Sequence, residues 1–327
     1  IERPFRRTYS FKTVLIFIFS LIILSMTVGY LSKYHKNFLY QSSIFLPQDE
    51  NNSIYWDDEI WHMLKDEDGK ECFDRNDDFC VFNPDAKKNI LLTGSSVGAS
   101  YTYNLQKDLD ENYKFIPMTA GGCIFIEDYF KVYENKEVKN YCDQKFMLNV
   151  KNIIEINQPS YVIYSGSFIL DAGGGTWFLK NSSETFNDII LVNDFKKNLY
   201  KILEKNIVIL IYPYPDSPYK TTMKDVHLNE LKLKFVDQKV QYLPIDQNYY
   251  YKAFNRTREI NIYDSIIHKN LIRVKPLDIL CKQTENCLSV IKNKFLFSNE
   301  DHPTYYGSSL ITDEIIKIIK STKLPTN

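Results

Sequence analysis

Short β-rich runs that alternate with helical stretches constrain the fold of this 327-residue chain most strongly. From Lys88 onward, the runs "NILLTG", "PSYVIYSG" and "NIVILIYPYP" are separated by stretches of helical character such as "QKFMLNVKNIIEIN" and "NDFKKNLYKILEKN". This alternation is typical of βαβ units, in which helices cover a mainly parallel sheet. Right-handed crossovers place the carboxyl ends of such strands along one edge, where α/β proteins bind ligands. We therefore expect an α/β domain at residues 88–327 with a functional site at that edge.

An uncharged segment of 19 residues, "TVLIFIFSLIILSMTVGYL", occupies positions 13–31. A helix needs ~20 apolar residues to cross a membrane, so we predict one transmembrane helix here. A secretory signal peptide is the alternative, because basic residues precede the run, but no clear small-residue cleavage site follows it. Four basic residues lie in residues 1–12 and two shortly after the segment. The positive-inside bias therefore predicts a cytoplasmic N-terminus and a main domain outside the cytoplasm.

All six cysteines follow this segment, and they form neighbouring pairs in the sequence: Cys72 with Cys80, Cys123 with Cys142, and Cys281 with Cys287. An even number of closely spaced cysteines outside the cytoplasm favours disulfide bonds, and local pairing is the simplest connectivity. Six buried thiols in a reducing compartment are the alternative. No CxxC spacing occurs and the five histidines are scattered, so zinc is the weaker interpretation and we expect no metal.

Residues 32–87 are polar, acidic and rich in Asn and Asp, with two tryptophans among them. We interpret them as a linker that packs on the domain that follows. The formal net charge of the whole chain is −1 at pH 7. This charge provides none of the basic surface that nucleic-acid-binding proteins have, so we expect no nucleic-acid partner.

The sequence "GSS" at residues 94–96 follows the first predicted strand and precedes a helix that we expect from about Gly98. A serine at such a turn lies beside free N–H groups of a helix N-terminus, where an oxyanion is stabilised. Serine is also a common helix N-cap, so the turn alone does not identify a nucleophile. His302 lies in a loop before the last predicted helix, residues 307–319, and is the best candidate for the base that a serine needs.

These segments resemble the sequence blocks of SGNH-type hydrolases. "ILLTGSSVGAS" resembles the first block, with Ser96 as nucleophile, and "DHPTYYGSSL" resembles the last, with His302 as base. "AGGCIF" resembles the second block, with Gly122 at the oxyanion position, and "PSYVIYSGSF" resembles the strand of the third block. The resemblance implies a three-layer α/β fold with a parallel sheet. It also implies that the N–H groups of Gly122 and Ser96 hold the oxyanion, and that Asn299 stands at the acid position.

The N-terminal "IERPFRR" resembles the Glu-x-Pro-x-Arg signature of acyltransferase-3 membrane proteins. The chain thus resembles the C-terminal part of such a protein, with its last transmembrane helix fused to a periplasmic SGNH domain. This implies a place in the inner membrane, beside the acyltransferase-3 domain of the same polypeptide. That domain would take an acyl group, typically acetyl, from cytoplasmic acyl-CoA. The SGNH domain, which needs no cofactor, would transfer it through an acyl-serine to a hydroxyl of a surface polysaccharide or lipopolysaccharide.

Four features depart from the family pattern: Ser95 in place of Asp, Val97 in place of His, no Asn between Ser165 and Phe168, and Asn299 in place of the acid. Asn299 can orient the imidazole by accepting from Nδ1–H, although it stabilises an imidazolium less than a carboxylate does. Asp301 or Glu300 is the alternative acid. Two other functions are therefore considered: a glycan-binding module without catalysis, and a carbohydrate esterase that uses the same serine and histidine.

Overall fold

The computed structural model describes residues 17, 19–23, 25–27, 60–76, 78–132, 142–165, 176–179, 188–217, 244–245, 247, 256–282, 287, 289–291, 294–298 and 302–325. The chain divides into two units, Ile1–Ser53 and Ile54–Asn327. In the first unit, the described residues are helical, and apolar side chains such as Phe19 and Met26 are exposed. None of the helices within the described residues is both long enough and apolar enough to cross a membrane. Much of the segment predicted to be a transmembrane helix lies outside the described residues.

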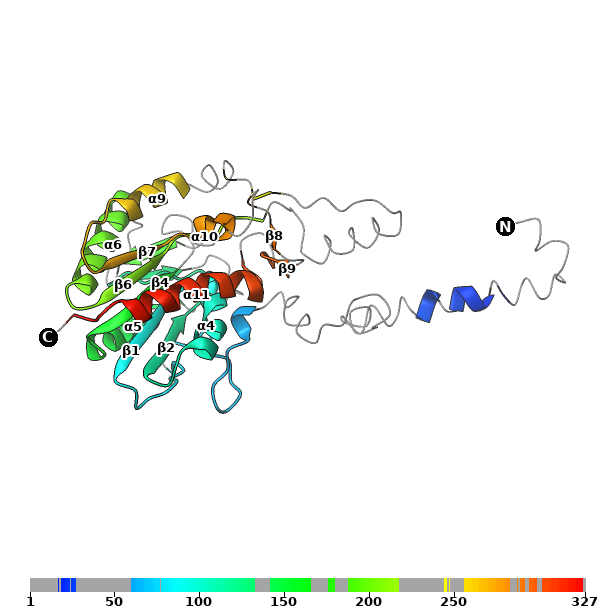
Figure 1. Ribbon diagram of the computed structural model, residues 1–327, viewed down its shortest axis with the longest axis horizontal. Helices are drawn as coiled ribbons and strands as arrows, with labels where there is room; N and C mark the ends of the chain where they lie inside the picture. Colours follow the sequence, from blue (N-terminus) through cyan, green and yellow to red (C-terminus); the bar gives the residue numbers. More distant parts are fainter. Residues whose placement is uncertain are drawn as a thin grey trace. The chain divides into compact units, whose positions relative to one another are not determined.

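The second unit is built on a five-stranded sheet whose strands are all parallel to their neighbours (Figure 1). The strands, in spatial order, are β2 (Tyr113–Thr119), β1 (Lys88–Gly94), β4 (Ser160–Ser165), β6 (Ile207–Ile211) and β7 (Leu271–Val274). The three β-rich runs of the sequence correspond to β1, β4 and β6, which are adjacent in the middle of the sheet. The structure therefore confirms the predicted parallel α/β fold.

Helices cover both faces of this sheet. They are α4 (Ser96–Asp108), α5 (Gln144–Ile156), α6 (Asp188–Leu203), α9 (Arg256–Asp264), α10 (Pro276–Lys282) and α11 (Tyr305–Ser321). Side chains of α4, α10 and α11 share one buried cluster with the strands, and side chains of α5, α6 and α9 share the other. The helix expected from about residue 98 begins two residues earlier, and the last helix is one turn longer than predicted. The result is three layers, as the family resemblance implies.

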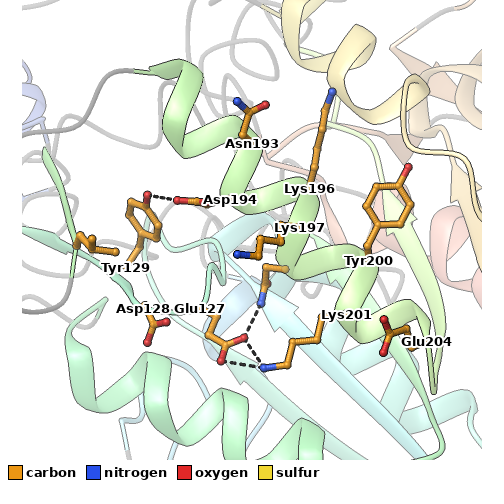
Figure 2. A pocket seen from close by; sticks show the side chains of 12 residues that line it. Glu127, Asp128, Tyr129, Asn193, Asp194, Lys196, Lys197, Tyr200, Lys201 and Glu204 are labelled. Atoms are coloured by element: carbon orange, nitrogen blue, oxygen red, sulfur yellow. Dashed lines mark hydrogen bonds and ion pairs between the residues drawn. The ribbon is translucent and has the colours of Figure 1, made fainter.

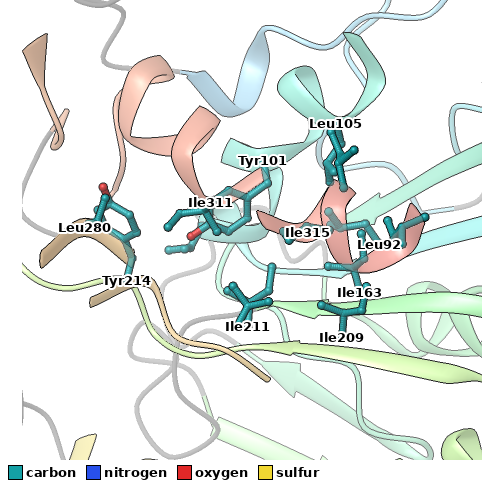
Figure 3. Packing of buried hydrophobic residues seen from close by; sticks show 14 of the residues in the cluster. Leu92, Tyr101, Leu105, Ile163, Ile209, Ile211, Tyr214, Leu280, Ile311 and Ile315 are labelled. Carbon is teal, nitrogen blue, oxygen red and sulfur yellow. The ribbon is translucent and has the colours of Figure 1, made fainter. Parts of the chain in front are cut away.

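Alternating side chains of the central strands enter the two clusters. In β1, Ile90 and Leu92 belong to the cluster under α4 and α11, whereas Leu91 belongs to the cluster under α5 and α6. Figure 3 shows Leu92 and its strand neighbours facing Ile311 and Ile315 of α11. Because both faces are buried, these strands read as continuous apolar runs and not as an apolar–polar alternation.

The segment before β1 packs against the free edge of β2. It begins with a short 3₁₀ helix, η2 (Ile60–His62), and Ile60 and Leu64 are buried. The backbone of Phe82 exchanges two hydrogen bonds with that of Phe115 in β2, each 3.0 Å long. Residues 60–82 of the expected linker therefore contribute to the second unit and cover its edge strand, which would otherwise be open to pairing with another chain.

The described structure also contains two small antiparallel sheets of two strands each and three disulfide bonds. β3 (Tyr129–Val132) pairs with β5 (Thr176–Leu179), and β8 (Val290–Ile291) pairs with β9 (Lys294–Phe295). The disulfide bonds join Cys72 to Cys80, Cys123 to Cys142, and Cys281 to Cys287. The local pairing expected from the sequence is confirmed.

Candidate active site

Ser96 and His302 meet at the carboxyl edge of the parallel sheet, although 206 residues separate them in the sequence. The Oγ atom of Ser96 lies 2.8 Å from Nε2 of His302, and both side chains are partly exposed. When Nε2 carries no proton, it accepts the hydroxyl hydrogen of Ser96, which is the geometry of a general base beside a nucleophile. The structure thus brings together two residues that the sequence motifs predicted for one site.

A tight turn between β1 and α4 presents Ser96. Ser95 is the N-cap residue of α4, with an extended backbone, and its side chain is fully buried but makes no capping hydrogen bond. Its N–H donates to the carbonyl oxygen of Ser165, the last residue of β4, at 3.3 Å. A Cβ atom on Gly94 would lie only 1.4 Å from the same carbonyl oxygen, so only glycine fits there. Ser96 is therefore the first residue of the helix, where backbone N–H groups lack intrahelical partners.

The loop before α11 fixes the position of His302. The carbonyl oxygen of His302 accepts the N–H of Ser298 at 3.0 Å. Two residues later, the Thr304 hydroxyl accepts the N–H of Gly307 at 3.0 Å, and thereby caps α11, and donates to the carbonyl of Phe295 at 2.6 Å. The backbone is thus held at His302 itself and two residues after it, where α11 begins.

Buried polar contacts hold α4 and α11 against each other. The Ser308 hydroxyl of α11 donates to the carbonyl of Ser100 in α4 at 2.6 Å. The amide of Asn104 donates to the carbonyl of Tyr305 and to the Ser308 hydroxyl, both at 3.1 Å. All three polar side chains, Ser100, Asn104 and Ser308, are fully buried. Because α4 carries Ser96 and α11 follows His302 directly, these bonds set the spacing of the two residues.

The turn at residues 120–123, directly after β2, contains Gly122. The N–H of Ala120 donates to the carbonyl of Gly94 at 3.0 Å, so this turn begins beside the turn that carries Ser96. Gly122 has φ +63°, a left-handed conformation that favours glycine. The N–H of Gly121 donates to Oδ1 of Asp74 at 2.7 Å. The predicted oxyanion residue thus follows the strand next to the one that presents Ser96.

Asn299, Glu300 and Asp301, the predicted acid and its alternatives, lie outside the described residues, as does the region of the third block after Ser165. Their roles stay predictions. Within the described part of the chain, no group of three or more His, Cys, Asp or Glu side chains is arranged to bind a metal ion.

A polar hollow lies elsewhere, between α6 and the start of β3 (Figure 2). It has a volume of about 860 Å³, and none of the predicted site residues lines it. Two of its carboxylates have partners in the lining: Glu127 pairs with Lys201 at 2.9 Å, and Asp194 accepts from the Tyr129 hydroxyl at 2.6 Å. Volume alone therefore does not mark the site of chemistry, and we place it at Ser96 and His302.

Asp74 and Asn104 are residues of this edge that the sequence motifs did not identify. Asp74 lies in the Asn- and Asp-rich stretch, where nothing in the pattern distinguishes it from its acidic neighbours. Asn104 lies inside a helix, where its type gives no indication of a partner on α11. Their contacts span 47 and about 200 residues of sequence, so only the fold reveals them.

Known proteins share the sequence pattern and the fold of this domain. A family model described as an SGNH domain fused to AT3 domains matches residues 64–317. The periplasmic domain of a lipopolysaccharide acetyltransferase from Salmonella ser. Paratyphi A is 18% identical, with a TM-score of 0.54 over 84% of this chain and 98% of that chain. A member of the lipolytic G-D-S-L family from Veillonella parvula is 14% identical, with a TM-score of 0.36 over 72% and 100% of the two chains. Curated proteins gave no match.

Proposed function

The chain belongs to the family of SGNH domains that are fused to AT3 domains, and from this membership we propose that it is an O-acyltransferase acting on a cell-surface glycan. The observation that carries the proposal is the 2.8 Å contact between Ser96 Oγ and His302 Nε2. A serine paired with a histidine at the edge of a parallel sheet is suited to acyl transfer through a covalent intermediate.

In the first half of the proposed reaction, His302 takes the hydroxyl proton of Ser96 while Oγ attacks the carbonyl carbon of the acyl donor. The N–H groups of Gly122 and Ser96 bind the oxyanion that forms, and one such donor contributes about 3 kcal/mol to the transition state. The tetrahedral intermediate then expels the donor group, which takes the proton from His302. The product of this half is an ester on Ser96. Asn299, or Asp301 as the alternative acid, orients His302.

In the second half, a sugar hydroxyl takes the place of the departed donor group. His302 removes the proton of this hydroxyl, and the oxygen attacks the acyl carbon of the ester. Collapse of the second tetrahedral intermediate returns the proton to Ser96 and releases the acylated glycan. The AT3 domain of the same polypeptide supplies the acyl group, which it takes from acyl-CoA on the cytoplasmic side.

Two observations support an acceptor outside the cytoplasm. The three disulfide bonds suit an oxidising compartment such as the periplasm. One solved structure of similar fold is the periplasmic domain of a lipopolysaccharide acetyltransferase, which favours acetyl as the acyl group and lipopolysaccharide or a related polysaccharide as the acceptor. A glycan-binding module has no need of a serine hydroxyl in contact with an imidazole, so the contact favours catalysis. An esterase would use the same pair with water as the acceptor.

The Ser96→Ala variant tests the proposal, with Ser95→Ala as its matched partner on the same turn. We expect Ser96→Ala to abolish glycan acylation because no oxygen is left to carry the ester, and Ser95→Ala to keep substantial activity. Acylation is measured by mass spectrometry of glycan from cells that express each variant, and circular dichroism of the purified proteins checks the fold. Undiminished acylation by a folded Ser96→Ala protein would exclude the nucleophile. Product that forms only with a glycan acceptor distinguishes a transferase from an esterase.

A further inference from the structure

We propose that Asp74 and Lys131 are positioning residues that hold the Gly122 N–H in the orientation an oxyanion requires. This inference rests on the proposed function, because it assigns a role to side chains around the turn at residues 120–123, the proposed oxyanion turn. Their effect is on the backbone of residues 120–123.

The Gly122 N–H belongs to the peptide group that joins Gly121 to Gly122. A charged side chain binds the peptide group on each side of it. On the preceding peptide, the N–H of Gly121 donates to Oδ1 of Asp74 at 2.7 Å. On the following peptide, the carbonyl oxygen of Gly122 accepts from Nζ of Lys131 at 3.5 Å. With both neighbours held, the peptide between them has little freedom to rotate.

Asp74 is itself fixed. It lies between the cysteines of the Cys72–Cys80 disulfide, and it adopts φ +59°, which few residues other than glycine do. Its N–H donates to the carbonyl of Thr119, the last residue of β2, at 3.0 Å. The neighbouring Arg75 is buried, and its guanidinium binds Asp66 at 2.6 Å and the carbonyls of Lys70 and Asp78 at 2.8 and 2.9 Å. These contacts hold the backbone of Asp74 in place, and with it the carboxylate that accepts the Gly121 N–H.

Lys131 approaches the turn from β3, and its side chain is fully buried. Its backbone N–H donates to the carbonyl of Cys142 at 2.9 Å, and Cys142 forms the disulfide with Cys123, the residue after Gly122. Its Nζ lies 5.8 Å from the centre of the Trp177 ring, on the strand paired with β3. A buried ammonium group is costly without polar partners. The contact of Nζ with the Gly122 carbonyl therefore holds both the lysine and this peptide group in place.

The two charges also complement each other. A carboxylate near an oxyanion opposes the developing negative charge, and a nearby ammonium offsets that effect. An oxyanion donor works only when it lies within about 2.7–3.1 Å of the charge, and a displacement of about 1 Å can reduce a rate by roughly 100-fold. A side chain that fixes the donor before substrate binds can therefore have a large effect on the rate through the backbone alone.

The test measures acylation of Ser96 by p-nitrophenyl acetate in the full chain, from the burst of nitrophenolate at several ester concentrations. We expect Asp74→Ala to lower the maximal acylation rate by roughly 10–100-fold with little change in the half-saturating concentration, because a misplaced donor weakens the transition state and not ester binding. Asp74→Asn keeps an oxygen that accepts the Gly121 N–H and should remain within about 3-fold of the wild type. Asp68→Ala is the control, because it removes an exposed carboxylate from the same acidic segment before β1.

The outcomes separate this inference from the proposed function. If the wild type shows no acylation of Ser96, the proposed function fails. If the wild type is acylated and Asp74→Ala matches it, only the positioning role is overturned. Where Asp74→Ala does not fold, Asp74→Glu keeps the charge and shifts the acceptor by one methylene. A lowered maximal rate in Asp74→Glu supports the inference, and a wild-type rate overturns it.

Discussion

Two glycines next to the site are required by the close approach of another backbone. A Cβ atom on Gly94 would lie 1.4 Å from the carbonyl oxygen of Ser165, and one on Gly307 would lie 2.3 Å from that of Leu296. The first contact packs the turn that carries Ser96 against β4. The second packs the start of α11 against the chain that leads to His302. The glycines of the two end motifs therefore serve the spacing of the reactive residues and have no chemistry of their own.

We predict that Gly94→Ala destabilises the protein by about 3 kcal/mol, because the added carbon overlaps a strand backbone that cannot move without breaking the sheet. The same change should lower acylation of Ser96, since the turn must shift. Gly98→Ala is the matched control: its Cβ would lie 3.1 Å from the Ser165 carbonyl, a tight contact that a small shift relieves. Urea unfolding should find the control within about 1 kcal/mol of the wild type. Equal midpoints for both variants would contradict the prediction.

The sequence predicted the two side chains that the structure brings into contact, Ser96 and His302, but not the residues around them. Ser96 and His302 stand in local motifs whose residue types and order carry the signal. Asp74 acts through a left-handed backbone and a contact 47 residues away, and neither property is encoded by its neighbours in sequence. Lys131 is buried beside Trp177 of β5, the strand that pairs with β3, although lysine itself predicts a solvated side chain.

At the scale of elements, Glu127 joins two helices of the outer layer to the loop that follows the oxyanion turn. Lys151 of α5 and Lys201 of α6 both form ion pairs with its carboxylate. Burial raises the pKa of Glu127, but the hydrogen bonds and charges of the two lysines outweigh it, and the pKa lies below its usual value. A carboxyl whose pKa is lowered by folding stabilises the folded state at neutral pH, and this contribution is lost as the pH falls through the lowered pKa.

We therefore predict that Glu127→Gln lowers the free energy of unfolding at pH 7 by about 1 kcal/mol, since the pairs are only partly shielded from water. The difference from the wild type should shrink as the pH falls through the lowered pKa of Glu127, because the protonated carboxyl no longer pairs with the two lysines. Urea titrations at pH 7 and pH 3.5 measure both values. Glu204→Gln, an exposed residue lining the same hollow, is the control and should change little at either pH. A difference that stays constant with pH would argue against the ion pairs as its cause.

Two of the five sheet strands have no clear signal in the sequence, for physical reasons. β2 contains Pro117, which usually argues against a strand, but β2 is an edge strand and tolerates the missing N–H. β7 has only four residues, and Arg273 interrupts its apolar pattern. The central strands β1, β4 and β6 are buried on both faces and could be predicted. The sequence pattern therefore predicted the central strands of the sheet but not its two edge strands.

Across the whole molecule, covalent bonds reinforce regions that have few strands of their own. The Cys72–Cys80 bond lies in the segment that covers the edge of β2, and the Cys123–Cys142 bond closes the chain between the oxyanion turn and α5. The Cys281–Cys287 bond joins the end of α10 to the chain that leads to β8. All three lie outside the central sheet, whose parallel strands are held by the two apolar layers.

We predict that replacing both cysteines of a disulfide by serine lowers the free energy of unfolding, and that the loss is larger for the disulfide that closes the longer loop. The Cys123–Cys142 bond spans 19 residues and should contribute about 3 kcal/mol, and the Cys281–Cys287 bond spans 6 and should contribute about 2 kcal/mol, if restriction of the unfolded chain dominates. Urea unfolding of each double variant gives the two values. Thiol alkylation of the folded wild type should label no cysteine of these pairs, and labelling would show that the bonds are absent.

The pairing of Ser96 with His302 across 206 residues also sets when activity can arise during synthesis. The ribosome makes the turn of Ser96 first, and the imidazole proposed to activate this serine follows 206 residues later. A nascent or prematurely terminated chain that stops before residue 302 therefore carries a serine without a base. Such a fragment cannot accept an acyl group by the proposed route, so acyl donor is consumed only by chains that have been made and folded to the end of the domain.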